Sequence, residues 1–359
     1  MKTQEINAAD DLSGKTLATG WVVIEKIEKA KNATGAFFSV CYKVAKNNQI
    51  CFLKAFDFAK FFQIAEQGSI ANNNPPPQIV DVMANMINAF KYEKDLSDLC
   101  KNEHVTKVSF VRDSGEEVVD GYSISIVPYL IFDLADGDVR AKIDFSHKLD
   151  FAWRLKSLHD IAVGLKQLHN IEVSHQDLKP SNILLFDEDS KIGDLGRSIC
   201  KQIRSPHDGN PFPGDYNYAP PEIMYRYYEK DWHRRLFATD CYLLGSMIVF
   251  YFSGISMSAL LLKHIPRNFR WDVWRGTFSE VKPYIIDAFS QALNEVESSI
   301  KDDYFRRELR WLVERLCYPF PEGRGHPKNI AGRGSFYSLE RFITKLDLLH
   351  KRAQYLLRH

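Results

Sequence analysis

Two neighbouring segments of the chain bring together residue types that metal-assisted phosphoryl transfer requires. They are His175-Gln176-Asp177-Leu178-Lys179-Pro180-Ser181-Asn182 and Lys191-Ile192-Gly193-Asp194-Leu195-Gly196. Such transfer depends mostly on positioning and on neutralising charge at the phosphate oxygens. Asp177 is the candidate for the carboxylate that orients the attacking hydroxyl and accepts its proton. Asn182 and Asp194 offer the oxygen ligands that Mg²⁺ prefers, and Lys179 can reach the transferred phosphate as a mobile positive charge.

The residues on either side predict the elements that position these groups. A short strand-like run, Ile183 to Phe186, follows the first segment, and a helix-periodic apolar run precedes it. The helical run consists of Leu155, Leu158, Ile161, Ala162, Leu165 and Leu168. The alternative interpretation is an ordinary surface loop, because Asp, Asn, Pro and Ser are common turn formers. A chance loop need not lie between a helix and a strand, so the sequence favours a functional site.

The two segments resemble the catalytic loop and the metal-binding loop of the eukaryotic-type protein kinase family, whose patterns are H-R-D-L-x-x-x-N and D-F-G. This chain departs from them at Gln176, where the family has Arg, and at Leu195, where it has Phe. The sequence D-L-K-P-x-N, with Lys179, is similar to the serine/threonine branch. Two later segments, 214–222 and 239–245, resemble the end of the activation segment and the helix that follows it.

The resemblance implies an α+β fold with two lobes, a small β-rich N-terminal lobe and a larger helical C-terminal lobe. We expect an N-terminal extension over residues 1–19, the N-terminal lobe over 20–135 and the C-terminal lobe over 136–359. ATP and Mg²⁺ are the implied cofactors, bound between the lobes, with Mn²⁺ as an alternative ion. Residues 1–19 read as an extension because they offer little apolar surface to offset the entropy of ordering.

Three β-rich runs, 21–24, 37–44 and 50–56, predict successive antiparallel strands. Lys54 in the third run resembles the family lysine that contacts the α- and β-phosphates, and Glu93 in the helical stretch 88–96 is its implied partner. Under a shifted register the partner would be Asp95 or Asp98. A lone strand lysine is more often a solvated edge residue, so this assignment depends on the downstream motifs.

The segment Ala33-x-Gly35-x-x-Phe38-x-Val40 occupies the place of the family's glycine-rich loop, so Gly35 and Val40 are candidate nucleotide-binding residues. Gly35 alone remains of three family glycines. Further along, Asp113-Ser114-Gly115-Glu116-Glu117 predicts the turn of a hairpin between strands at 107–111 and 122–132. The second of these strands leads to the family's interlobe hinge.

Near that hinge the resemblance places Phe132 beside the adenine, the backbone from Asp133 to Ala135 at the hinge itself, and Asp138 near the ribose. In the C-terminal lobe it implies two further contacts. The counterpart of Asp240 accepts backbone hydrogen bonds from the catalytic loop, and the counterpart of Glu222 forms a buried pair with a late arginine, for which Arg324 is well placed.

Charge and cysteine content narrow the function classes. The chain has 359 residues with 47 basic and 46 acidic side chains, so no global field favours a nucleic acid or an anionic membrane as partner. Its six cysteines are scattered without C-x-x-C pairs, which indicates reduced thiols and a cytoplasmic protein. We expect no membrane segment, because the longest apolar run, 241–252, is too short to span a bilayer and suits a buried core helix.

These observations together predict an ATP-dependent serine/threonine protein kinase that phosphorylates protein hydroxyls, with autophosphorylation as a further reaction. A neutral amide at Gln176 cannot provide charge-assisted contacts to a phosphate, so we expect activity without activation-loop phosphorylation. Two alternatives stay open. One is a small-molecule phosphotransferase, and the other is a non-catalytic scaffold, which the altered glycine-rich loop and Gln176 suggest.

Overall fold

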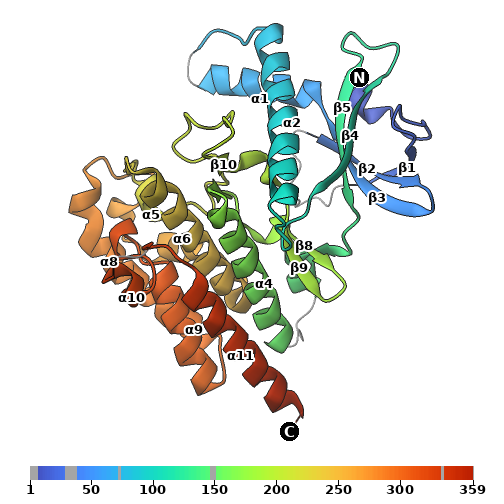
Figure 1. Ribbon diagram of the computed structural model, residues 1–359. Helices are drawn as coiled ribbons and strands as arrows, with labels where there is room; N and C mark the ends of the chain where they lie inside the picture. Colours follow the sequence, from blue (N-terminus) through green and yellow to red (C-terminus); the bar gives the residue numbers. More distant parts are fainter. Residues whose placement is uncertain (1–6, 29–38, 72–73, 146–150, 333–334, 359) are drawn as a thin grey trace. The chain divides into compact units, whose positions relative to one another are not determined.

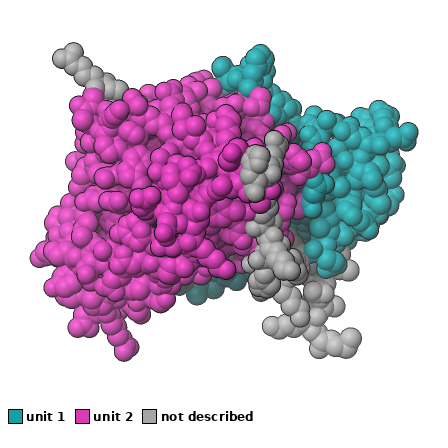
Figure 2. Space-filling view, turned by 90° about the horizontal axis from the view of Figure 1, so that it is seen from below, with its two compact units in different colours: residues 1–104, 109–136, 203–206 teal, residues 105–108, 137–202, 207–359 magenta. Residues whose placement is uncertain are grey.

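The computed structural model describes residues 7–28, 39–71, 74–145, 151–332 and 335–358 (Figure 1). The chain divides into two compact units (Figure 2). Unit 1 comprises residues 1–104, 109–136 and 203–206, and unit 2 comprises residues 105–108, 137–202 and 207–359. The boundary expected after residue 135 therefore falls next to the one observed after 136, with two short segments exchanged between the units.

Unit 1 is built on a five-stranded antiparallel sheet in the order β1-β2-β3-β5-β4. Its strands are β1 (Val22–Lys26), β2 (Ser39–Lys46), β3 (Gln49–Phe56), β4 (Val111–Val118) and β5 (Ile126–Asp133). Its helices are α1 (Phe58–Ala71) and α2 (Ile79–Asn102), and a short 3-10 helix, η1 (Ala8–Asp10), precedes β1. Figure 1 shows α2 lying along β4 and β5.

Alternation along the strands of unit 1 produces a core on each face of the sheet, because successive side chains of a strand point to opposite faces. On β3, Leu53 and Ala55 belong to the core cluster that also contains residues of the N-terminal segment. Phe56, on the other face, packs with Phe90 of α2 at a ring-centroid distance of 5.5 Å. Lys54 shares the face of Phe56 and is therefore directed toward α2.

The described part of the expected N-terminal extension is packed into unit 1. Ala8, Ala9, Leu12 and Leu17 are all buried in the core cluster of the first face. The prediction of a separate extension over residues 1–19 is thus wrong for residues 7–19. Sequence reasoning underrated this segment because its few apolar residues are spaced irregularly, yet each of them meets the sheet.

The predicted turn at residues 113–117 is also wrong, because these residues form the middle of β4. Gly115 is paired with Tyr129 of β5, and a Cβ at Gly115 would lie 2.4 Å from the tyrosine hydroxyl. The glycine is needed for this close approach and not for a turn. β4 is an edge strand, where polar side chains are well tolerated. The connection instead runs through residues 119–125, with Gly121 at a φ of 94°.

Unit 2 is mainly helical. It carries short sheets beside residues 175–182, which resemble the kinase catalytic loop and are called the catalytic segment below. Its strands are β6 (Gly137–Asp138), β7 (Val173–Ser174), β8 (Ile183–Phe186), β9 (Asp189–Ile192) and β10 (Ile199–Cys200). Its helices are α3 (Val139–Phe145), α4 (Phe151–Asn170), α5 (Pro221–Met224), α6 (Trp232–Ser253), α7 (Met257–His264), α8 (Phe278–Ser298), α9 (Asp303–Leu316), α10 (Pro327–Ile330) and α11 (Glu340–Arg358). The strand and helix that the sequence predicted around the catalytic segment are thus β8 and α4. The expected α+β organisation, with a β-rich first part and a helical second part, is confirmed.

Helix α6 forms the centre of unit 2, with α4 and α9 packed against it. Within the described residues it is the one helix long and apolar enough to cross a membrane, but 89% of its most apolar window is buried inside the structure. An amphipathic pattern is absent because α6 contacts neighbours on all sides. This burial matches the core helix that the sequence predicted.

Candidate active site

The catalytic segment begins where β7 ends, and the buried carboxylate of Asp240 on α6 anchors its first residues. Asp240 accepts hydrogen bonds from the backbone N–H groups of His175 and Gln176, both at 2.9 Å, and from the Ser174 hydroxyl at 2.7 Å. The His169 ring contacts the same carboxylate at 2.9 Å. Burial alone would raise the pKa of Asp240, but the hydrogen bonds from His169 and the loop outweigh burial and lower it.

This anchoring stabilises a strained backbone. Gln176 has a φ of 63°, in the left-handed region that residues other than glycine rarely adopt. Its side-chain amide donates to the Ser174 hydroxyl at 2.7 Å and to the Leu236 carbonyl at 3.0 Å. The amide that replaces the family arginine is therefore buried and used for local bonds. It fixes the loop from inside rather than facing the activation segment.

Asp177, the predicted base, is held on both carboxylate oxygens. Its Oδ1 accepts the backbone N–H of Asp215 at 2.8 Å, and its Oδ2 accepts the Asn182 amide at 3.1 Å. Lys179 lies 3.1 Å from Oδ2 and 3.5 Å from the carboxylate of Asp215. The structure thus brings the predicted base and the predicted phosphate-stabilising lysine into contact. Asp215 provides a second carboxylate that forms an ion pair with Lys179.

Asn182 and Asp194, the predicted metal ligands, are brought together by the β8–β9 hairpin. The two strands pair Ile183 with Ile192, so the residues just outside this pair are neighbours. The backbone N–H of Gly193 donates to the Asn182 carbonyl at 2.8 Å, and Asp194 is the next residue. Asp194 adopts a φ of 58°, which turns the chain sharply after the hairpin.

The donor set at this place fits Mg²⁺. The Asn182 amide nitrogen donates to both the carbonyl and the carboxylate of Asp177, which leaves the amide oxygen as the ligand atom. One carboxylate and one amide oxygen are a small set, but Mg²⁺ commonly keeps waters and is completed by substrate phosphates. No group of three or more His, Cys, Asp or Glu suited to a metal occurs among the described residues, so a site formed entirely by such side chains is not present there.

The lysine and glutamate predicted in unit 1 form an ion pair. Lys54 Nζ lies 2.8 Å and 3.0 Å from the two carboxylate oxygens of Glu93, and both side chains are largely buried. Glu93 is one helical turn beyond Phe90, which packs on the Lys54 face of β3. The alternative partner Asp98 instead pairs with Lys94 on the same helix, at 3.1 Å. The pair is thus formed in the register that the sequence predicted first.

The remaining candidate nucleotide-binding residues lie at strand ends. Gly35 is outside the described residues. Val40 is buried on β2, Phe132 lies near the end of β5 with its ring 6.4 Å from that of Phe52, and Ala135 follows β5. Asp133 forms an ion pair with Arg112 on the neighbouring strand.

Asp138 belongs to unit 2, where it pairs with β8. Its carboxylate accepts the backbone N–H of Ala141 at 2.8 Å and so caps helix α3. The roles predicted for these residues in binding adenine and ribose stay predictions.

The buried pair implied at the end of the activation segment is present. Arg324 donates to both oxygens of Glu222, at 2.7 Å and 2.9 Å, although 102 residues separate them. The guanidinium also donates to the carbonyls of Tyr318, Pro319 and Ala238. Burial would lower the pKa of Arg324, but the carboxylate of Glu222 outweighs burial and raises it. Arg324 therefore links the first turn of α5, through Glu222, to the backbone of α6 and of the segment after α9.

Sequence reasoning missed two contributors to this site. His169 at the end of α4 contacts Asp240 and stacks on Phe237 at a centroid distance of 3.9 Å. Arg197 donates to the Pro213 carbonyl, so it braces the activation segment across its own loop. No sequence signal could have identified them, since a histidine at a helix end and an arginine in a loop usually face solvent.

Comparison with known proteins agrees with this geometry. The model of the protein kinase domain matches residues 116–302, slightly more than half of the chain. The matched range contains Asp177, Lys179, Asn182 and Asp194.

Curated relatives carry related descriptions. The serine/threonine-protein kinase atg1 of Dictyostelium discoideum is 30% identical over 182 residues, which cover 48% of this chain and 26% of that protein. A probable serine/threonine-protein kinase of the same organism is 28% identical over 190 residues, covering 50% and 23%. The serine/threonine-protein kinase par-4 of Caenorhabditis briggsae is 34% identical over 107 residues, covering 28% and 16%. The match thus spans 16% to 26% of these relatives' lengths. With the family model, the catalytic segment and the two-part α+β fold in agreement, this chain belongs to the protein kinase domain family, of the eukaryotic serine/threonine type.

Proposed function

We propose that the protein transfers the γ-phosphoryl group of ATP to serine or threonine hydroxyls of proteins. The observation that carries this proposal is the environment of Asp177. One of its carboxylate oxygens is fixed by the Asp215 N–H and the other by Asn182 and Lys179. A base held on both oxygens is oriented for one approach direction, which is how positioning lowers the barrier of this reaction.

The proposed step follows from these contacts. The substrate hydroxyl oxygen forms a bond to the γ-phosphorus while the bond from that phosphorus to the β,γ-bridging oxygen breaks and ADP leaves. Asp177 accepts the hydroxyl proton, and Lys179 offsets charge on the transferred group. Asn182 and Asp194 would hold Mg²⁺, which neutralises phosphate charge when bound. We assign Lys54, fixed by Glu93, to the α- and β-phosphates.

We also propose that turnover does not require a phosphorylated activation segment. Gly214 approaches the catalytic loop so closely that a Cβ would lie 2.2 Å from the Gln176 carbonyl oxygen. The next residue, Asp215, bonds Asp177, and Arg197 braces Pro213. These direct bonds within unit 2 support the proposal, because they hold the segment beside Asp177 without a phosphate group.

The decisive experiment measures transfer of labelled phosphate from ATP to the protein itself and to a generic basic protein. Wild type should give signal, and Asp177→Ala should lower kcat by roughly 10²–10⁴-fold, the usual contribution of a positioned base. Asp287→Asn, an exposed carboxylate on α8, is the matched control and should behave as wild type. Equal signal from wild type and Asp177→Ala would refute the assignment of the base.

Two further measurements test the finer proposals. Phosphatase treatment before the assay should leave kcat within about twofold, because no charge-assisted phosphate contact is available at Gln176. Loss of activity would count against independence from phosphorylation. Phosphate appearing only on a metabolite, and never on protein, would favour the small-molecule alternative. We propose a cytoplasmic location, which the scattered spacing of the six cysteines, without C-x-x-C pairs, supports.

A further inference from the structure

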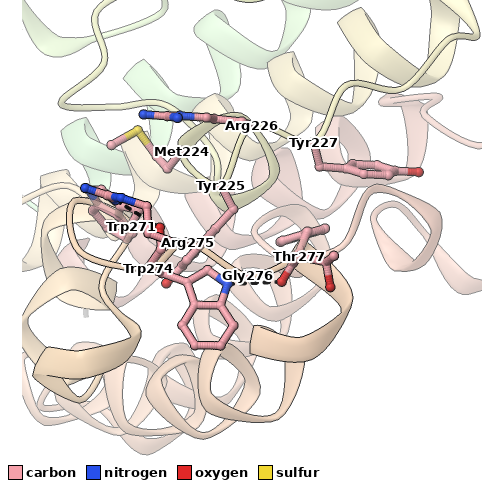
Figure 3. Close-up of a pocket in the computed structure, with 10 residues that line it drawn as sticks. Met224, Tyr225, Arg226, Tyr227, Trp271, Trp274, Arg275, Gly276 and Thr277 are labelled. Carbon is pink, nitrogen blue, oxygen red and sulfur yellow. Dashed lines mark hydrogen bonds between the residues drawn. The ribbon is translucent and has the colours of Figure 1, made fainter.

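A pocket of unit 2 lies just beyond the end of the activation segment and plays no part in the proposed transfer (Figure 3). Its volume is about 380 Å³, within the range of ligand-binding sites. Five aromatic side chains line it: Tyr225, Tyr227, Trp271, Trp274 and Phe278. Two arginines, Arg226 and Arg275, complete the wall. In Figure 3, Arg226 extends beside Met224, while Tyr227 is directed to the other side.

Two polar groups of the aromatic wall, on Tyr225 and Trp274, form hydrogen bonds inside the protein. The Tyr225 hydroxyl donates to the Phe269 carbonyl at 2.6 Å, and burial, with a smaller effect from Asp272, raises its pKa. The Trp274 indole N–H donates to the Thr277 carbonyl at 3.1 Å, drawn as a dashed line in Figure 3. The wall therefore offers apolar surface, and its charge comes from the two guanidinium groups.

Arg226 occupies a backbone position that normally favours glycine. Its φ is 60°, and it is the first residue past the cap of α5. The backbone N–H of Arg226 bonds the Ile223 carbonyl at 3.0 Å, and that of Tyr227 bonds the Glu222 carbonyl at 2.8 Å. This pair of bonds is the Schellman motif, in which glycine avoids the steric cost of the left-handed conformation. An arginine here is costly for stability, and strained residues of this kind cluster at ligand sites.

The positive charge of the pocket is not neutralised by the protein. Within the described residues neither arginine pairs with a carboxylate, and the Nη1 atom of Arg275 donates to the carbonyls of Asp272 and Trp274. Two acidic side chains are near. Glu280 caps α8 by accepting hydrogen bonds from both the backbone N–H and the hydroxyl of Thr277. Asp272 is near Tyr225, where its negative charge contributes to the raised pKa of the tyrosine. No acidic residue lines the pocket itself, so it suits an anionic partner with apolar or aromatic groups.

We propose that this pocket docks an acidic segment of the protein substrate, an inference that rests on the proposed kinase function. Charge complementarity selects the acidic residues, and the aromatic wall accepts an apolar side chain among them. The chain itself limits the distance from the site of transfer. Asp215 contacts Asp177, and Arg226 is eleven positions further along, so the separation is at most roughly 40 Å. About a dozen extended substrate residues can span it.

Direct binding tests the pocket without any phosphoryl transfer. The probe is a fluorescein-labelled peptide with several Asp and Glu around one Phe, titrated with the wild-type protein and followed by fluorescence anisotropy. Arg226→Gly and Arg275→Ala should each weaken binding about tenfold or more, since each removes charged hydrogen bonds. Arg307→Ala, an exposed arginine on α9, is the matched control and should bind as wild type.

Arg226→Gly separates loss of binding from loss of folding, because glycine relieves the strain at this position. Its Tm should equal or exceed that of wild type, while its binding of the acidic peptide is weakened about tenfold or more. Equal binding by Arg226→Gly and wild type would overturn the proposal. Equal binding of a neutral peptide, with Asn and Gln in place of the acidic residues, would overturn it as well.

Kinetics then connect the pocket to the reaction. Two peptides carry the same acceptor serine, and in one of them an acidic segment follows after a linker of about a dozen residues. For wild type the peptide with the acidic segment should have the lower KM. The ratio of the two KM values should fall about tenfold in Arg275→Ala. An unchanged preference would refute substrate docking. Transfer to no protein at all would instead contradict the proposed function, and the binding titration would still report on the pocket.

Discussion

The buried pair of Glu222 and Arg324 makes a quantitative prediction about the stability of unit 2. Removing either partner leaves the other charge buried, which costs roughly 3–5 kcal/mol. Glu222→Leu should lower the free energy of unfolding by an amount near the lower end of this range, because Arg324 keeps its hydrogen bonds to the carbonyls of Tyr318, Pro319 and Ala238. Arg324→Met should lower the free energy of unfolding by an amount near the upper end, because those carbonyls also lose their hydrogen-bond donor. The double variant leaves no uncompensated charge, so it should be more stable than additivity implies, with a coupling of roughly 3 kcal/mol.

Urea unfolding followed by circular dichroism measures these differences. Lys263→Met provides the control, because its ion pair with Glu295 is largely exposed and should contribute less than about 1 kcal/mol. If Arg324→Met does not fold, Glu222→Gln keeps the shape of the side chain and still tests the charge. Additive single effects, or single losses no larger than that of the control, would refute the reasoning that burial makes this pair costly to break.

Three further outcomes follow from the same structure. Asp240→Asn should lower Tm at neutral pH and make Tm less dependent on pH in the acid range. The pKa of the Asp240 carboxylate is lower in the folded than in the unfolded state, so its contribution to stability is present above about pH 4 and is lost as the pH falls through the folded-state pKa. Gly214→Ala places a Cβ 2.2 Å from a backbone carbonyl oxygen of the catalytic loop and should reduce kcat by roughly a hundredfold in the phosphate-transfer assay, whereas unaltered kcat would contradict the tight docking of that segment. Glu93→Gln should reduce kcat/KM for ATP by roughly tenfold or more, since a charged hydrogen bond contributes about 1.5–3 kcal/mol, while Asp98→Asn on the same helix should not; equal effects would argue for the shifted register.

Much of the site could be predicted from sequence because its residues are close in the chain. A single short loop before β8 contains Asp177, Lys179 and Asn182. Their spacing in the sequence therefore nearly determines how they are arranged in space. Asp194 is added by a short hairpin, whose register follows from the alternation of β8 and β9. Lys54 and Glu93 are further apart, but strand and helix periodicities both direct them to the same interface.

Predictions from local sequence were wrong where contacts with distant residues determined the conformation of the segment. Gly115 with its acidic neighbours predicted a turn, and only the ring of Tyr129 on the adjacent strand explains why the glycine lies within β4. Leu12 and Leu17 carried no periodic pattern, yet the sheet buries both. In these places the preference of the segment is weak, and contacts with distant residues decide the conformation.

Sequence by itself predicted the chemistry that we propose for this protein: a short segment supplies the candidate base, the candidate cation and oxygens of the type that bind Mg²⁺, and local backbone geometry sets their spacing. The Asp240 anchor and the pair of Glu222 with Arg324 were already implied by the resemblance to the kinase family. Tertiary structure alone decided what else lies around that segment. The contact of His169 with Asp240 and the pocket that joins Arg226 to Arg275 connect residues from separate elements. Such contacts depend on how helices pack, and the packing of a whole unit is a sum of many weak interactions that no local pattern records.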